Sequence, residues 1–106
     1  MKVIRIHKRV CKELEKLDFS LKRQLTELLG LLAEGENLGM PISRPMSIVE
    51  RGVYELRIKD RSGQYRVFYY IKKTDVIFVF HFYKKKTQEV PLQEVETAKN
   101  RLKEML

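Results

Sequence analysis

Three closely spaced segments with strand-like alternation constrain the fold of this chain more than any other feature. They are Val53–Asp60, Tyr65–Ile71 and Val76–Tyr83, all rich in β-branched and aromatic residues. Short polar turns separate them, at Arg61–Gly63 and at Lys72–Asp75. Turns of this length join antiparallel neighbours, since a parallel crossover needs a dozen or more residues. The second half of the chain therefore predicts an antiparallel sheet.

The flanking segments predict an α+β fold. Residues 1–106 contain no repeat and no linker, so we expect a single domain. We expect an N-terminal strand, a helical hairpin, a mostly antiparallel twisted sheet and a C-terminal helix. In order, these elements are a strand at Lys2–Ile6, a helix from His7 to about Leu17, a helix from the candidate N-cap Ser20 to near Gly35, a loop at Asn37–Pro45, a short strand at Met46–Val49, the three strands above and a final helix opened by Pro91.

Alternation assigns the side chains of the three strands to two faces of the sheet. Leu56, Val67 and Phe80 mark the more apolar face, which we expect to receive the helices. The opposite face is expected to be open.

Register predicts a row of basic side chains on that open face. An even-length first turn places Arg57 opposite Arg66, and a four-residue second turn at residues 72–75 places Arg66 opposite His81. The row Arg57, Arg66, His81 then crosses the sheet, with two neighbours beside it, Lys59 and Tyr83.

Two arginines directly opposite each other destabilise a sheet unless a negative charge relieves them. Glu55 or a helix carboxylate could supply that charge from within the protein. Alternatively, the pair forms a phosphate site, for which guanidinium forks are well suited. Both interpretations stay open, and the net charge favours the second.

The chain carries 22 lysines and arginines against 14 acidic residues, a net charge of +8. This excess favours a polyanionic partner such as nucleic acid or the ribosome, although a soluble domain can be basic without one. The lysine run Lys84–Lys86 extends the predicted row, so we expect a groove for an RNA backbone, with Tyr70 and Tyr83 available for base stacking. The candidate RNA-binding residues are Lys59, Arg61, Tyr70, Lys84 and Lys86.

Other features narrow the class of protein. Cys11, the single cysteine, lies in a helical pattern among apolar residues, which predicts a buried structural thiol. No membrane-spanning stretch or signal peptide is evident, so we expect a cytoplasmic protein. No cluster of histidine, cysteine and carboxylate residues has metal-ligand spacing, so no metal or cofactor is expected, and His7 is expected to be structural.

Three motifs resemble the pattern of RelE/ParE-superfamily toxins. They are Tyr54-Glu55-Leu56-Arg57, then Tyr65-Arg66-Val67-Phe68-Tyr69, then Lys84-Lys85-Lys86-Thr87-Gln88 followed by Pro91. The resemblance covers essentially the whole chain and is strongest to the phage-related branch that includes HigB-type toxins. Two departures are Tyr83, where a phenylalanine is usual, and the absence of tyrosine or histidine after Lys86.

The resemblance implies the toxin of a type II toxin–antitoxin system, with a RelE-like fold. Such toxins enter the ribosomal A site and cleave messenger RNA with basic residues rather than a metal. Their cognate antitoxin, often a helix-turn-helix protein, masks the toxin and contacts operator DNA. By position, Arg57 and Arg66 match the family's basic active-site residues, while Lys59 and Lys84–Lys86 match its surrounding positive charge.

Cleavage of RNA through its own 2′-hydroxyl requires a base, charge stabilisation of the pentacovalent phosphate and a proton for the leaving 5′-oxygen. Arg57 and Arg66 are the candidates for charge stabilisation. His81 is the candidate acid–base residue because its ordinary pKa suits neutrality, with a partly buried structural histidine as the alternative. Lys85 or Tyr83 could substitute if neighbouring charge lowered its pKa.

Two other functions are compatible with the same sequence: a ParE-like toxin that binds DNA gyrase without catalysis, and a basic nucleic-acid-binding module. The basic row favours the enzyme. The open face would also expose Phe68, Ile77 and Val79, so an acidic, amphipathic antitoxin segment is expected to cover it. The alternative cover is the chain's own C-terminal helix.

Overall fold

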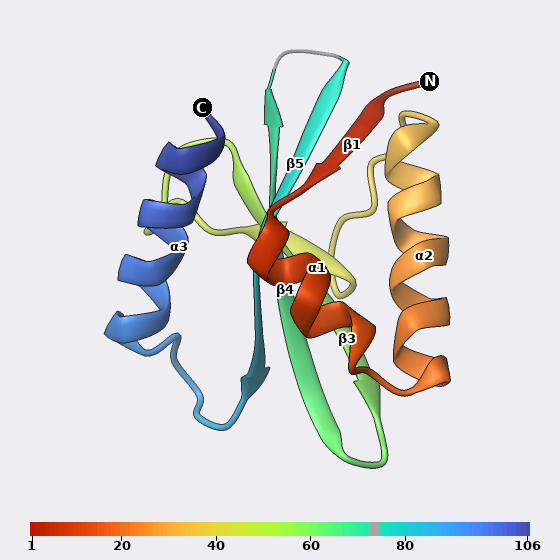
Figure 1. Cartoon of the computed structure of the whole chain (residues 1–106), viewed down its shortest axis with the longest axis vertical. Coiled ribbons are helices and arrows are strands. Elements are labelled where there is room, and N and C mark those ends of the chain that lie inside the picture. The colour runs from red at the N-terminus through yellow and green to blue at the C-terminus, as the bar shows by residue number, and fades with distance from the viewer. Residues whose placement is uncertain (73–74) are drawn as a thin grey trace.

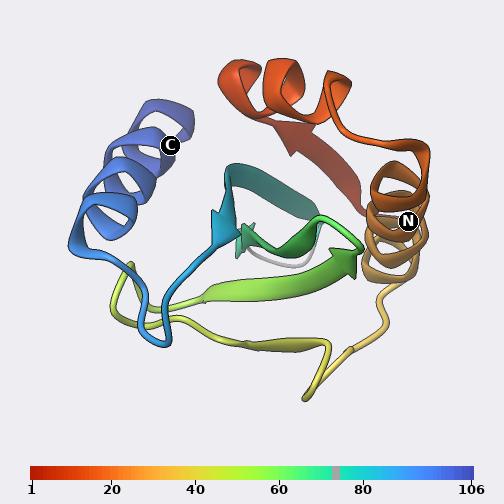
Figure 2. The ribbon, with the colours of Figure 1, turned by 90° about the horizontal axis from the view of Figure 1, so that it is seen from below.

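The computed structural model describes residues 1–72 and 75–106. The five strands form one sheet in the order β1-β5-β4-β3-β2, with helices on both sides of it (Figures 1 and 2). Of the strand pairings that the structure describes, β1–β5 is parallel and the others are antiparallel, so the expected α+β fold is confirmed. The elements are β1 (Val3–Ile6), α1 (Lys8–Glu15), α2 (Phe19–Ala33), β2 (Ser43–Pro45), β3 (Val53–Asp60), β4 (Gly63–Lys72), β5 (Val76–Lys85) and α3 (Leu92–Met105).

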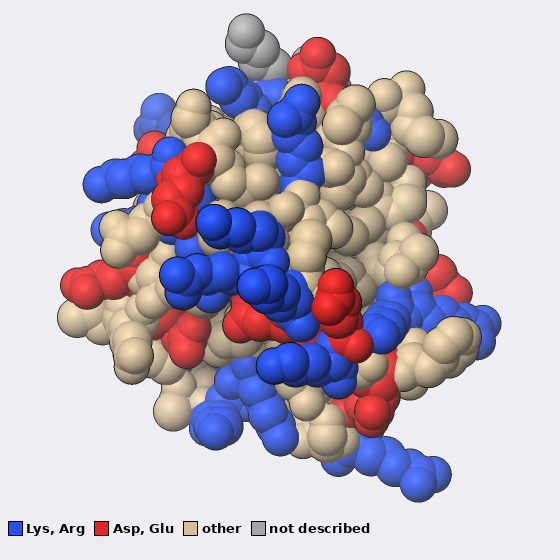
Figure 3. Space-filling model, in the orientation of Figure 1, with Lys and Arg blue, Asp and Glu red and all other residues tan. Residues whose placement is uncertain are grey.

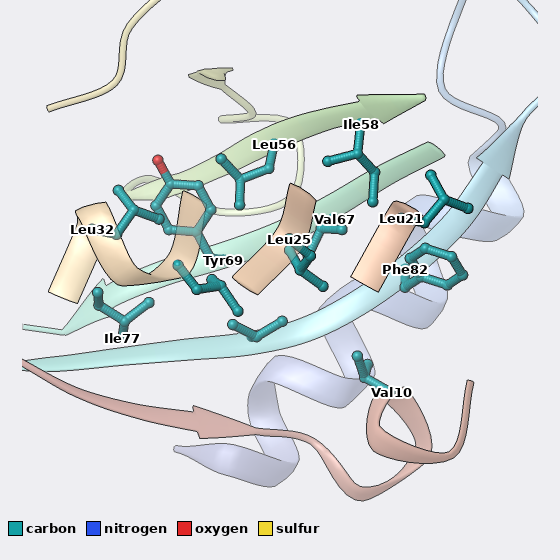
Figure 4. Packing of buried hydrophobic residues seen from close by; sticks show 12 residues of the cluster. Val10, Leu21, Leu25, Leu32, Leu56, Ile58, Val67, Tyr69, Ile77 and Phe82 are labelled. Carbon is teal, nitrogen blue, oxygen red and sulfur yellow. The ribbon is translucent and has the colours of Figure 1, made fainter. Parts of the chain in front are cut away.

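The first hydrophobic core lies between the sheet and the hairpin of α1 and α2 (Figure 4). Alternate residues of β3 and β4, such as Leu56 and Val67, face this core, and α2 meets them with a stripe of leucines. Burying one such side chain contributes about 1.5–3 kcal/mol, so these positions decide which face the hairpin covers. The buried members are Val10, Leu21, Leu25, Leu29, Leu32, Leu56, Ile58, Val67, Tyr69, Ile77, Val79 and Phe82.

A second core lies on the opposite face, beneath α3 (Figure 2). The expectation of an open face is therefore wrong for this part of the sheet, and the alternative cover, the C-terminal helix, is the one observed. Phe68 is fully buried here, whereas Ile77 and Val79 are buried on the hairpin side. The buried members are Met46, Val49, Val53, Phe68, Phe80, Tyr83, Val95, Ala98 and Leu102.

A register shift in β5 redirects the side chains that follow it. Phe68 pairs with His81 but Tyr69 pairs with Val79, so Phe80 is left over as a β-bulge. Phe80 consequently packs in the second core, which corrects its predicted place beside Leu56. The predicted second turn includes residues 73 and 74, which lie outside the described residues.

Two differences in register correct the predicted row of basic side chains. Val76 pairs with Lys72 rather than with the predicted Ile71, and the bulge at Phe80 displaces the pairing by one residue more. The turn between β3 and β4 is even, since Asp60 pairs with Gly63, and Arg57 lies opposite Arg66 as predicted. On β5, however, the residue opposite Arg66 is Tyr83, not His81.

Three local expectations also differ from the structure. The short strand before β3 is Ser43–Pro45 rather than Met46–Val49, because Ser43 and Arg44 pair with β3 while the chain turns at 47–49. Asp18 rather than Ser20 occupies the N-cap position of α2. Cys11 is exposed rather than buried, and it lines a hollow between α1 and α2. None of the described helices has the length and apolarity that a membrane crossing requires.

The turn before β3 generates a stability prediction. Gly52 has φ +93°, and a Cβ there would lie 2.9 Å from Cε1 of Tyr70, so Gly52→Ala is both strained and crowded. We expect a loss of about 1–3 kcal/mol in the free energy of unfolding, measured by urea denaturation. Gly30→Ala is the matched control, because its Cβ would meet open space on α2 and should stabilise by about 0.5–1 kcal/mol. A Gly52→Ala protein as stable as the parent would contradict this account of the turn.

Candidate functional site

A buried carboxylate surrounded by three arginines lies on the α3 side of the sheet. Glu55 is only 1% exposed, and its Oε1 lies 3.3 Å from Nε of Arg44, 3.3 Å from Nε of Arg57 and 3.4 Å from Nε of Arg66. A lone buried carboxylate is costly, whereas one surrounded by cations is compensated. We call these four residues the arginine cluster.

The register of the sheet brings the cluster together. Arg44 on β2 is the direct cross-strand partner of Glu55 on β3. Arg57 follows Glu55 by two residues and shares its face, and Arg66 on β4 is the partner of Arg57. Each arginine is therefore a nearest neighbour of Glu55 on one pleated surface. Arg44 was missed by the sequence analysis because its strand has only three residues and lies in a predicted loop.

Glu55 relieves the repulsion between Arg57 and Arg66, as one of the two interpretations from sequence required. It does so incompletely, because one carboxylate faces three guanidinium groups. Nε of Arg44 and Nε of Arg66 are buried and have no hydrogen-bond partner among residues 1–72 and 75–106. Burial is the main cause that lowers the pKa of Arg66, with Glu55 opposing it. The cluster is thus a concentration of positive charge that one carboxylate does not balance, the chemistry that suits an oxyanion.

Two further predicted catalytic residues, Tyr83 and Lys85, lie next to the cluster on β5. Tyr83 is opposite Arg66, and Lys85 is opposite Gln64 at the end of the same face. Burial, with Glu55 next, raises the pKa of Tyr83 to about 12, so its hydroxyl is protonated at neutral pH. Burial and then the charge of Arg66 lower the pKa of Lys85, which increases its free-amine fraction.

Hollows flank the cluster on two sides. A cleft of about 330 Å³ opens at the edge of β3 beyond β2, where Gln24 of α2 donates from Nε2 to the carbonyl oxygen of Lys59 at 2.7 Å. Arg44 lines a second hollow of about 680 Å³. The cleft is lined by Gln24, Pro41, Ile42, Arg57, Ile58, Lys59, Gln64 and Arg66.

His81, the predicted acid–base residue, lies outside the arginine cluster. The bulge places it under α3, where it is 3% exposed and Nε2 lies 2.7 Å from Oε1 of Glu94. Nδ1 lies 3.2 Å from Nη1 of Arg101, which also contacts Glu13 of α1. A guanidinium only donates, so Nδ1 must accept and the proton is on Nε2. His81 is therefore a neutral ring that links β5 to α3, which corrects its predicted place in the basic row.

The predicted RNA-binding residues are divided between two faces. Lys59 lines the cleft, and Tyr70 is half-buried against Gly52. Lys84 lies on the hairpin side, with Nζ 5.9 Å from the ring centre of Tyr65. Adjacent residues of a strand face opposite ways, so Lys84 and Lys85 lie on different faces. The structure therefore separates Lys84 from Lys85. The two remaining residues, Arg61 and Lys86, are exposed at the β3–β4 turn and after β5.

Positive charge is not confined to the arginine cluster. Figure 3 shows lysine and arginine side chains gathered over α1 and between α1 and α3, where Lys8, Arg9, Lys12 and Arg101 line a hollow with Glu13. What distinguishes the cluster is that three arginines meet one buried carboxylate, with Arg66 5% exposed and Glu55 1% exposed. Within residues 1–72 and 75–106, no group of three or more histidine, cysteine, aspartate or glutamate side chains could hold a metal ion.

Comparisons with known proteins identify the family. The model of a family described as phage derived protein Gp49-like (DUF891) matches residues 12–103. The chain belongs to the Gp49-like family. This phage-derived family agrees with the phage-related branch that the sequence motifs resemble.

The fold comparison agrees with the family. A mutant of the E. coli toxin RelE, solved in the free state, is similar to the Gp49-like chain over 99% of this chain and 98% of that one, with 24% sequence identity and a TM-score of 0.51. At that identity the likeness shows the fold, which is RelE-like as predicted. A search of curated proteins finds no match.

The buried histidine of this Gp49-like protein predicts a pH-dependent stability. Burial is the main cause that lowers the pKa of His81 below 6.5, opposed by Glu94 and assisted by Arg101. As the pH falls through 6.5 the unfolded chain takes up a proton that the folded chain does not, so stability is lost until the folded pKa is passed. We expect the free energy of unfolding of the parent protein to fall between pH 7.5 and 5.5 by more than that of His81→Asn. Equal pH dependence in the two proteins would show that His81 is not held neutral.

Proposed function

We propose that this protein is the toxin of a type II toxin–antitoxin system and cleaves messenger RNA on the ribosome. The observation that carries the proposal is the arginine cluster, in which three guanidinium groups gather on one buried carboxylate between two hollows. The RelE-like fold and the Gp49-like family support it, because ribonuclease toxins occur on this fold. Attack by the 2′-hydroxyl on the adjacent phosphate is the reaction that the cluster fits best.

The arginines supply charge stabilisation in this proposal. In-line attack puts a second negative charge on the phosphate oxygens, and donors fixed in a poorly hydrated site stabilise that charge most effectively. Arg57 and Arg66 line the cleft at the edge of β3, so a phosphate bound there is within reach of both. Their electrostatic role is one that a metal ion fills in other nucleases.

Lys85 is the proposed general base, since His81 is engaged beneath α3. Burial and the charge of Arg66 lower the pKa of Lys85, which favours the free amine that would take the proton from the 2′-hydroxyl. Tyr83 stays protonated, and its buried hydroxyl, which has no hydrogen-bond partner in the part of the chain that the structure describes, can donate to the phosphate or the leaving 5′-oxygen.

The two adjacent lysines on β5 provide the test. Lys85→Gln and Lys84→Gln each remove one positive charge. They differ in position, because Lys85 faces the cluster and Lys84 faces the helical hairpin. Primer extension on cellular mRNA after induced expression should show a roughly 100-fold or greater loss of cleavage for Lys85→Gln, the usual worth of a general base. Lys84→Gln should lose less than about tenfold, because it removes only a surface charge.

Two results would count against the enzyme. Equal losses in the two variants would mean that charge, not position, is what matters. Intact mRNA with DNA damage in cells that express the parent protein would favour the ParE-like, gyrase-binding alternative. Circular dichroism of each variant, purified with its antitoxin, controls for folding.

A cognate antitoxin and the ribosome are the proposed partners. An antitoxin segment that carries carboxylates would neutralise the arginine cluster and close the cleft beside β3. We expect the product of the adjacent gene to co-purify with tagged toxin, to relieve growth arrest and to dissociate more readily at high salt. If the neighbouring product neither binds nor relieves toxicity, the toxin–antitoxin proposal fails.

A further inference from the structure

The proposed cleavage reaction does not require a carboxylate, yet Glu55 places one in the site. It is the negative charge at the centre of the arginine cluster, and it is almost completely buried. We propose that Glu55 is a positioning residue, whose carboxylate gathers three arginines into one site for the oxyanion of an RNA phosphate. This inference rests on the proposed function, because it names how the same site is assembled.

The geometry of the three contacts supports positioning rather than simple neutralisation. Each arginine meets the same oxygen, Oε1 of Glu55, through Nε. Contact at Nε leaves the terminal amino groups of Arg44 and Arg57 as the fork that can bind phosphate in a bidentate manner, whereas those of Arg66 donate within the protein. A carboxylate that neutralised an arginine fully would instead occupy that fork.

The three arginines differ in how deeply they lie. Arg66 is the buried floor, and its terminal amino groups donate to the carbonyl oxygen of Tyr65 and to Oε1 of Gln64. The side chains of Arg44 and Arg57 are 37% and 26% exposed. Arg44 and Arg57 come from different strands. Glu55 is the cross-strand partner of Arg44 and lies on the same face of β3 as Arg57, so it holds both arginines toward a common point.

The charge of the cluster matches a transition state better than a substrate. Three guanidinium groups and one carboxylate leave a net charge of +2. A phosphodiester carries one negative charge, whereas the pentacovalent species formed by 2′-hydroxyl attack carries two. An interaction that strengthens as the reaction proceeds raises the rate, while one that is equal throughout raises only affinity. Glu55 therefore limits attraction for intact RNA while keeping the arginines in place for the reaction.

Two substitutions separate charge from position. Glu55→Gln preserves the size of the side chain and removes its charge, so the cluster becomes more positive. Glu55→Asp keeps the charge but draws the carboxylate back by one methylene, so it cannot reach all three arginines. Glu27→Gln is the matched control, because Glu27 pairs with Arg23 at 3.1 Å on the exposed surface of α2.

The readouts are cleavage rate on programmed ribosomes and affinity for a 2′-O-methyl RNA oligonucleotide, which cannot be cleaved. We expect Glu55→Gln to bind the oligonucleotide as tightly as the parent or more tightly, and Glu55→Asp to bind it equally well. Both should cleave mRNA on the order of 100-fold more slowly, the cost of misplacing catalytic groups by about 1 Å. Glu27→Gln should match the parent in both measurements.

Thermal denaturation with inorganic phosphate, against chloride at equal ionic strength, tests the site independently of cleavage. Phosphate should raise the melting temperature of the parent, and raise that of Glu55→Gln further, because the cluster then lacks the negative charge that offsets its arginines. Parent-like cleavage by both Glu55 variants would overturn the inference. The inference would also be overturned if the Glu55 variants lost cleavage and RNA affinity together and phosphate did not raise their melting temperatures. That pattern indicates a purely structural ion pair. If the parent itself fails to cleave mRNA while the phosphate and oligonucleotide results hold, the proposed function fails and the positioning role stands.

Discussion

The pairing of β3 with β4 is the constraint on which the rest of this structure depends. Their even turn fixes a register in which Leu56 meets Val67 on one face and Arg57 meets Arg66 on the other. A slip of one residue would exchange the two faces and bury charge beneath the helical hairpin, so the apolar core enforces the basic pair. Repulsion in that pair then requires a nearby anion, and the pleat of β3 places Glu55 at that point.

The sheet forms part of two hydrophobic cores and also carries the candidate site, because helices cover its two edges to different extents. Toward the end where β1 joins β5, helices lie on both faces (Figure 2). Toward β2 and the β3–β4 turn, α3 no longer covers the face of the sheet on which it packs, and the arginines of the cluster lie on that uncovered part. The bulge at Phe80 marks the transition, because it adds an aromatic side chain to the core beneath α3 and sets Tyr83 and Lys85 beside the arginines. Neutral His81 joins the covered part through Glu94 and Arg101, and contributes to holding α3 in place.

The parts of the fold that follow from local patterns could be predicted from the sequence, and the parts that depend on a single extra residue could not. Alternation in β3 and β4 and an even turn were sufficient to place Arg57 opposite Arg66. In β5 both faces are buried from Ile77 to Tyr83, and every residue there except His81 is hydrophobic, so alternation carries no signal of a bulge. Arg44 was out of reach for a different reason: three residues that end in a proline have no strand signature, and only the pairing with β3 makes them a strand. The RelE-like resemblance predicted the fold and two arginines but not the buried carboxylate network around them.

The parallel pairing of β1 with β5 has a consequence for synthesis of the chain. Val3 pairs with Val76, so β1 must wait until β5, the last of the described strands, has been made before it finds its partner. Contacts between such distant segments form late, because the intervening chain must close as a loop first. The site also draws Lys85 from that last strand and Arg44 from a segment made much earlier. A partly translated chain therefore has the arginines but neither the completed sheet nor the lysine, so the candidate site is assembled only after β5 has been made.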